Sequence, residues 1–248
     1  TQLVFNGLVT GSIYSIIAVG LVLIYRTLGI INFFHSTMYM LGALTGYKLY
    51  CELQLPILIV FPVCLLAVGL LGAVIERIVL RPLSTGVQTR IVIGTVIIGD
   101  TIINNLALPI IGPYAVRFES YLPGISFNVG PLRIQDQQIL IVVVSVALGI
   151  LLTIFFRSTR MGKTFRAMAS NPKAALLMGV NVSHMRMATF GLASGIGALA
   201  GLLVGPMYIV SSTMGDTMLL KASVVAVLDG LDSMVGAIVG GLIIGVVD

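Results

Sequence analysis

Four long stretches without a single charged side chain constrain the fold of this chain more than any other feature. They span residues 1–25, 56–75, 137–156 and 187–209. A helix needs about 20 apolar residues to cross the roughly 30 Å hydrocarbon core of a bilayer, so each stretch predicts one membrane-spanning helix. Only 9% of all residues are charged, too few to cover a compact particle in water. The sequence therefore predicts an integral membrane protein of the all-α class.

Two further apolar segments are each interrupted by one ionisable residue. His35 lies within residues 28–47, and Asp100 lies within residues 91–116. We expect each segment to contribute another membrane-embedded helix, which a break can divide.

The last segment is apolar but is divided in two. Asp229, Gly230 and Asp232 cut residues 221–248 into two short halves. Non-helical backbone at membrane depth is tolerated only where protein or a cavity surrounds it, and transport sites are often built from such half-helices. The sequence thus predicts a polytopic transmembrane helical bundle with broken or re-entrant helices.

The positions of the basic residues predict the orientation in the membrane. Nine of the 14 basic residues lie within residues 76–90 and 157–186, whereas basic and acidic residues balance in residues 112–136. The positive-inside rule places both basic segments in the cytoplasm. These residues are too dispersed for a phosphate-tracking stripe, so we expect a lipid membrane and no nucleic acid as partner.

Two pairs of similar glycine-rich segments suggest inverted repeats. Gly-Leu-Val-Thr-Gly at residues 7–11 resembles Gly-Leu-Ala-Ser-Gly at residues 191–195, and residues 42–46 resemble residues 236–240. The predicted orientation makes the helices that carry the first pair run in opposite directions, as in an inverted-repeat transporter. Glycine-rich apolar sequence also produces such similarity by chance, so both explanations stay open.

The sequence lacks patterns for nucleotide binding and metal binding, and no nucleophile-elbow pattern accompanies its serines, although a catalytic triad and an intramembrane enzyme stay open as an alternative. Residues 162–164 read Gly-Lys-Thr, but a phosphate-binding loop needs glycine where Arg157 stands. The two histidines, His35 and His184, lie in different parts of the chain and have no neighbouring ligands at metal-binding spacing. We therefore expect a protein that is not an enzyme and holds no metal or cofactor.

Polar residues inside the apolar segments are candidates for lining a translocation path. A charged group at the bilayer centre costs about 2.5–3.5 kcal/mol and usually faces a cavity or a partner. The candidates are Asn32, His35, Ser36, Asp100, Asn104, Asp229, Asp232 and Ser233. A helix beginning inside the membrane near Asn32 would also direct its positive dipole end into such a path. The alternative is a cluster of interhelical hydrogen bonds, which the sequence does not exclude.

The cytoplasmic segment 157–186 is too long for a tight turn between neighbouring spans. Residues 164–178 are predicted to form one short amphipathic helix, and Gly179-Val180-Asn181 provides a stop and a turn. Such a helix could lie on the lipid surface or dock into the groove of a partner. Composition alone slightly favours the lipid surface.

Several motifs resemble those of permeases from branched-chain amino-acid (LIV-type) ABC importers. Residues 166–181, Arg-Ala-Met-Ala-Ser-Asn-Pro-Lys-Ala-Ala-Leu-Leu-Met-Gly-Val-Asn, resemble the cytoplasmic coupling segment of that family. Residues 31–35 resemble its Asn-Phe-Ala-His signature, and residues 226–233 resemble its Gly-Gly-x-Gly-Ser turn. Order and spacing agree over essentially the whole chain, which is more similar to the LivH-type than to the LivM-type subunit. Asp229 and Asp232 depart from the glycines that this turn usually has.

The resemblance implies one transmembrane permease domain over residues 1–248, in the inner membrane of a bacterial cell. Its partners would be a second LIV-type permease, two cytoplasmic ATPase subunits and an external solute-binding protein. ATP and Mg would be bound by the ATPase subunits, with no cofactor on this chain. The residues expected to couple the permease to the ATPase are Arg166, Asn171, Ala174, Ala175, Gly179 and Asn181.

The resemblance also implies a further apolar helix after residue 248, so we expect the chain to lack a C-terminal helix of the family. Two alternative functions stay open on the residues alone. In an ion-coupled secondary transporter, Asp100 and Asp229 would be the coupling carboxylates. In a passive channel for urea-type or amide-type solutes, the same glycine-rich helices would line the pore.

Overall fold

The structure, a computed structural model, describes residues 2–83, 88–111, 116–129, 132–228 and 233–248. Within these described residues, four helices are long and apolar enough to cross a membrane. They are α1 (Gln2–Leu28), α3 (Ile57–Ile75), α7 (Asp136–Ser158) and α10 (Val182–Val204). These helices confirm the four predicted spans. Most residues of α1 and α10 are buried, whereas few residues of α7 are.

Shorter helices make up most of the remaining described chain. They are α2 (Phe34–Tyr47), η1 (Lys48–Glu52), η2 (Glu76–Leu80), α4 (Arg81–Leu83), α5 (Gln88–Val96), η3 (Ile97–Ile103), α6 (Asn104–Ile111), α8 (Arg160–Ser170), α9 (Pro172–Leu177), α11 (Met214–Leu228) and α12 (Met234–Val247). The helices of type η are π-helices. Helix α2 begins at Phe34 inside the bundle, directly after the buried, non-helical residues Ile30 and Asn32. The prediction of broken helices is therefore confirmed.

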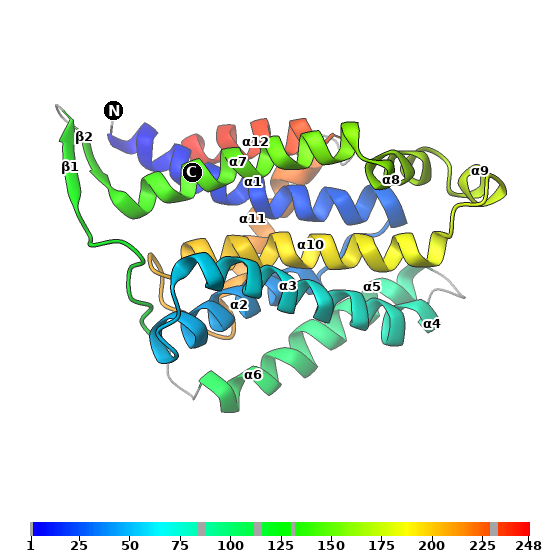
Figure 1. The fold of residues 1–248 in the computed structure, drawn as a ribbon, viewed down its shortest axis with the longest axis horizontal. Coiled ribbons are helices and arrows are strands. Elements are labelled where there is room, and N and C mark those ends of the chain that lie inside the picture. Colours follow the sequence, from blue (N-terminus) through cyan, green and yellow to red (C-terminus); the bar gives the residue numbers. More distant parts are fainter. Residues whose placement is uncertain (1, 84–87, 112–115, 130–131, 229–232) are drawn as a thin grey trace.

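The two basic segments lie at the same end of the bundle. Figure 1 shows α4, α8 and α9 at the right, and the N-terminus and the β-hairpin at the left. The helices α1 and α10 run in opposite directions between these ends. This arrangement agrees with the predicted orientation, with the α8–α9 end in the cytoplasm.

The packing of the helices agrees with the predicted inverted repeats. In chain order, α1, α2 and α3 correspond to α10, α11 and α12, and α1 packs on α12 as α10 packs on α3. The first pair of similar segments, residues 7–11 and 191–195, lies at these two contacts. A Cβ on Gly7 would lie 2.6 Å from the Gly245 carbonyl oxygen, and one on Gly191 would lie 3.2 Å from the Gly69 carbonyl oxygen. The second pair does not follow this order, because residues 42–46 lie in α2 and residues 236–240 lie in α12.

The predicted helix over residues 164–178 is wrong, because the chain forms two helices there. Asn171 has φ −153° and ψ 98° and separates α8 from α9. The reason is Pro172, whose ring lacks an N–H group and disfavours helical backbone at the residue before it.

Part of the stretch of residues 112–136 forms a β-hairpin. Strand β1 (Ser126–Val129) pairs antiparallel with β2 (Leu132–Gln135), with Ser126 opposite Gln135. The hairpin is tied to the start of α1, because the Arg133 backbone N–H donates to the Gln2 side chain over 2.8 Å. Such a short hairpin depends on tertiary contacts of this kind.

The first half of the final segment begins earlier than expected. Helix α11 starts at Met214, so Lys221 lies near its middle instead of at its start. A lysine is tolerated there because its ammonium forms an ion pair with the Asp248 carboxylate.

Candidate translocation path and coupling surface

The candidates Asn32, His35 and Ser36 lie together at the start of α2. Gly29 ends α1 with φ +68°, a left-handed conformation that glycine adopts readily. The chain then turns back, and the Asn32 side-chain oxygen accepts the Phe34 backbone N–H over 3.2 Å. All three side chains are buried, and His35 has no exposed surface.

The His35 ring fills a space between two central helices. A Cβ on Gly20 of α1 would lie 2.6 Å from His35 Nε2, and a Cβ on Gly197 of α10 would lie 3.2 Å from it. Only glycine leaves room for the ring at both positions. Within this chain, His35 thus occupies a packed position between α1, α2 and α10. The sequence showed the glycines but not that they face the histidine.

Two helices, α2 and α11, begin next to each other inside the bundle. The Ser36 carbonyl in the first turn of α2 packs directly against Gly215 in the first turn of α11. Helix N-termini carry unsatisfied N–H groups and partial positive charge. Sequence reasoning anticipated the start of α2 inside the membrane but missed the start of α11, because residues 205–214 contain no charged residue to mark a break.

The remaining path candidates fall into different surroundings. Asn104 begins α6 and is 9% exposed, and the preceding helix η3 packs against α2, where a Cβ on Gly99 would lie 2.7 Å from Thr37 Oγ1. Asp100 lies in η3, and its side chain is outside the described part, as are Asp229 and Asp232 altogether. Ser233 caps α12, because its hydroxyl accepts the Gly236 N–H over 2.9 Å.

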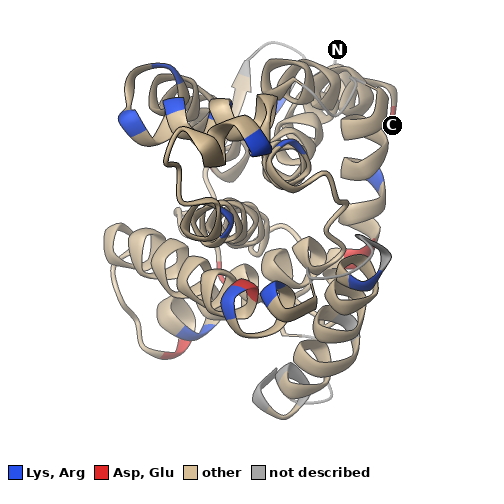
Figure 2. Ribbon diagram, turned by 90° about the vertical axis from the view of Figure 1, so that its right-hand side faces the viewer, with Lys and Arg blue, Asp and Glu red and all other residues tan. Residues whose placement is uncertain are grey.

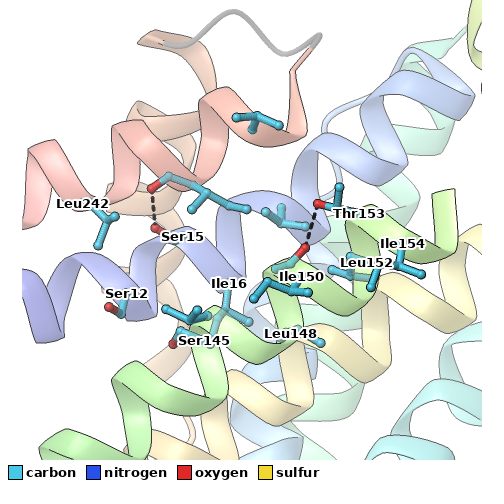
Figure 3. Close-up of a pocket in the computed structure, with 15 residues that line it drawn as sticks. Ser12, Ser15, Ile16, Ser145, Leu148, Ile150, Leu152, Thr153, Ile154 and Leu242 are labelled. Carbon is cyan, nitrogen blue, oxygen red and sulfur yellow. Dashed lines mark hydrogen bonds between the residues drawn. The ribbon is translucent and has the colours of Figure 1, made fainter. Parts of the chain in front are cut away.

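A groove of about 370 Å³ lies between α1, α7 and α12, away from these candidates (Figure 3). Its hydroxyl groups are already bonded to helix carbonyls. Ser15 donates to the Ile238 carbonyl and Thr153 to the Gly149 carbonyl, both over 2.8 Å. The other lining residues are almost all aliphatic, including Ile16 and Leu148. The groove offers a charged or strongly polar solute no free partner.

Three side-chain caps shape the segment expected to couple to the ATPase. Thr159 accepts the Gly162 N–H at the start of α8 over 2.9 Å, Asn171 accepts the Ala174 N–H at the start of α9 over 3.0 Å, and Asn181 accepts the His184 N–H at the start of α10 over 3.1 Å. Each cap satisfies an N–H group that the helix itself cannot bond.

Gly179 ends α9, as predicted. Its φ is +84°, and its N–H donates to the Leu176 carbonyl over 3.0 Å. The next N–H, of Val180, donates back to the Ala175 carbonyl. Paired bonds of this type close helix ends where glycine adopts the left-handed conformation.

The apolar surface of this segment is concentrated in a tip formed by Leu176, Leu177 and Met178. Their exposed fractions are 61%, 89% and 72%. Of the predicted coupling residues, Ala175 is buried, Ala174 is half-buried, and Arg166 is exposed. The predicted coupling residues thus include Ala174 and Ala175 but not the exposed Leu176 and Leu177 beside them. Three consecutive apolar residues before a helix-ending glycine were the available signal.

The end of the bundle that carries the tip is basic. Figure 2 views this end and shows Lys and Arg gathered on it. Residues 157–186 contain no Asp or Glu, and their exposed basic side chains are Arg157, Arg160, Lys163, Arg166 and Lys173. Basic charge beside an apolar tip suits a partner surface that carries acidic groups around an apolar groove.

Behind the tip lies a buried ionic cluster that sequence reasoning missed. Glu76 has no exposed surface, and its two carboxylate oxygens lie 3.5 Å from Arg186 Nε and 3.6 Å from Arg81 Nη2. The same Arg81 nitrogen donates to the Ser183 carbonyl over 3.0 Å. The cluster ties η2 and α4 to the start of α10, which directly follows the coupling segment. No local pattern marks it, because 110 residues separate Glu76 from Arg186.

The sequence of this chain is similar to those of known proteins. Residues 3–248 match the family described as "Branched-chain amino acid transport system / permease component". The chain is 32% identical to the high-affinity branched-chain amino acid transport system permease protein LivH of Salmonella typhimurium and 31% identical to BraD of Pseudomonas aeruginosa, covering in each case all of this chain and 84% of the relative. One solved structure, PsaBC from Streptococcus pneumoniae in complex with Fab, has a TM-score of 0.46 at 17% identity, over all of this chain and 80% of that one.

Proposed function

We propose, because this chain belongs to the family of branched-chain amino acid transport system permease components, that it forms one half of an ATP-driven amino-acid importer in the cell membrane. The solutes are branched-chain or related small amino acids. A second permease completes the path, two cytoplasmic subunits hydrolyse ATP, and an external protein delivers the solute. The match over residues 3–248 carries this proposal.

The tip formed by Leu176, Leu177 and Met178 is the contact with the ATPase. Its three apolar side chains are exposed at the basic end of the bundle, and exposed apolar groups surrounded by polar ones mark a protein interface. Arg166 provides charge beside the tip, and Asn171, Gly179 and Asn181 hold the shape of the segment. Movement of an ATPase subunit would then pass to α10 through the Glu76 cluster.

The path runs where the helices α2 and α11 begin, beside Asn32, His35 and Ser36. Asp100 and Asn104 belong to the neighbouring span, and Asp229, Asp232 and Ser233 to the turn before α12. An ion-coupled secondary transporter or a passive channel would not need a protruding apolar tip, and the family match does not favour either function.

A pull-down from mild detergent tests the proposal. We expect the unmodified chain to recover ATPase subunits, and Leu176→Ser with Leu177→Ser to lose them while the chain stays inserted. Ile125→Ser is the matched control, because Ile125 is 50% exposed on the same chain just before the β-hairpin at the opposite end. A chain that purifies alone and moves solute down an ion gradient would refute the proposal.

A further inference from the structure

Three cavities follow one another along α1 toward the cytoplasmic end of the bundle. The first is the apolar groove of about 370 Å³ between α1, α7 and α12, which Ile16 and Leu148 line (Figure 3). The second, of about 50 Å³, lies farther along the same three helices, beside Leu23, Phe156 and Met234. The third, of about 600 Å³, lies where α1 ends and meets α8. We call this row of cavities the seam.

The seam is about as long as one leaflet of a bilayer is thick. Ile16 lines the groove, and Arg26 lines both other cavities. Helix α1 rises about 15 Å between these two residues at 1.5 Å per residue, which is half of the roughly 30 Å hydrocarbon core. Because α1 and α7 both end at the cytoplasmic end of the bundle, the seam spans the cytoplasmic leaflet.

The groove suits an apolar occupant. The hydroxyl groups that line it already donate to helix carbonyls. At its rim, Val146, Ile150 and Val235 are 56%, 56% and 58% exposed. Lipid tails are as apolar as these side chains, so an acyl chain fills such a groove without leaving a polar group unpaired.

The cytoplasmic end of the seam is basic. Arg26 of α1 and Arg166 of α8 line the third cavity together with Tyr25 and Ser170. Within the part of the chain that the structure describes, neither guanidinium forms an ion pair. Guanidinium groups bind phosphate oxygens through charge-assisted hydrogen bonds. Basic pockets between membrane helices on the cytoplasmic side are typical sites for anionic head groups.

We propose that the seam binds one anionic phospholipid of the cytoplasmic leaflet. Its phosphate lies between Arg26 and Arg166, and one acyl chain passes Leu23 and fills the groove beside Ile150. A zwitterionic lipid binds less tightly, because its head group places an ammonium beside the two guanidinium groups. The bound lipid links α1 to α8, the helix that begins the coupling segment. This site is separate from the translocation path and goes beyond the proposed function.

Native mass spectrometry of the full-length protein in mild detergent tests the head-group contact. The protein, with any partners that co-purify, is stripped of lipid and titrated with phosphatidylglycerol or with phosphatidylcholine of the same acyl chains. We expect one phosphatidylglycerol per copy of this chain to bind at least about tenfold more tightly than phosphatidylcholine, and Arg26→Gln to remove this preference. Arg77→Gln is the matched control, because Arg77 is exposed on η2 at the same end but lines none of the three cavities.

Filling the groove tests the acyl-chain contact. We expect Ile150→Trp to weaken phosphatidylglycerol binding at least about tenfold, because the indole ring displaces several buried methylene groups of the lipid. Leu151→Trp is the matched control and should bind as the unmodified chain does, because Leu151 is the next residue of α7, is 63% exposed and does not line the groove. If Arg26→Gln weakens binding but Ile150→Trp does not, the arginines bind only an anion, and the phospholipid proposal is refuted.

Other occupants of the seam give different results. Equal phosphatidylglycerol binding by Arg26→Gln and Arg77→Gln would refute the proposal, because the arginines would then serve a carboxylate of the protein. If Ile150→Trp, but not Leu151→Trp, prevents a partner subunit from co-purifying, the groove is a protein interface and the proposal is refuted as well. Bound lipid is counted without ATP or solute, so its absence would leave the proposed function untouched, which the recovery of ATPase subunits tests separately.

Discussion

The buried ionic cluster of Glu76, Arg81 and Arg186 allows a direct test of how much one ion pair contributes to the stability of this chain. Replacing Glu76 by Gln removes the carboxylate but keeps the shape of the side chain. Arg81 and Arg186 then face each other without the negative charge that lies 3.6 and 3.5 Å from them. Removing one partner of a buried ion pair costs about 3–5 kcal/mol, because the remaining charge is left uncompensated.

The free energy lost in Glu76→Gln should lie at the lower end of that range. The side chain of Arg81 is 37% exposed and that of Arg186 is 19% exposed, so water can solvate part of the unpaired charge. We therefore expect Glu76→Gln to lower the free energy of unfolding by about 3 kcal/mol. At roughly 2–4 °C per kcal/mol for a chain of this size, the melting temperature should fall by about 6–12 °C.

A thermal melt in mild detergent measures this effect, with Glu52→Gln as the matched control. Glu52 forms an exposed pair with Lys48 over 2.8 Å, four residues apart in one helical turn. Such pairs contribute about 0.3–0.5 kcal/mol, so the control should melt within about 2 °C of the unmodified chain. Adding Arg186→Met to Glu76→Gln should recover part of the loss. Equal melting temperatures for Glu76→Gln and Glu52→Gln would refute the reasoning.

Three further predictions concern packing, coupling and the path. Gly245→Ala should destabilise the chain by about 1–3 kcal/mol in the same melt, because the new methyl group meets the Gly11 backbone, whereas Gly149→Ala meets only the end of the Ile238 side chain and should be tolerated. Gly179→Pro should lower solute uptake per ATP hydrolysed while the chain stays inserted, because proline cannot adopt φ +84° and lacks the N–H that bonds Leu176; unchanged uptake per ATP would contradict a coupling role. Asp100→Asn should alter the rate of solute uptake in liposomes, and normal uptake by a normally folded variant would favour a purely structural role for Asp100.

The local pattern of the sequence was enough to predict the spans and their direction. Stretches such as residues 137–156 are apolar over the full thickness of the bilayer, and the 9% of charged residues are too few to cover a compact particle in water. The clustering of basic residues in 157–186 then predicts that this end of the bundle faces the cytoplasm. The helix end at Gly179 was equally predictable, because one residue type meets the need for positive φ.

The pairings across the chain were decided only by the tertiary structure. His35 fits between Gly20 and Gly197, and Lys221 meets Asp248. Each pairing joins residues of different helices, and no local periodicity records which helix faces which. Sequence alone determined that these residues had to be embedded in a membrane bundle. Their partners followed from helix packing, since a buried charge or ring is stabilised by whatever group the neighbouring helix places within reach.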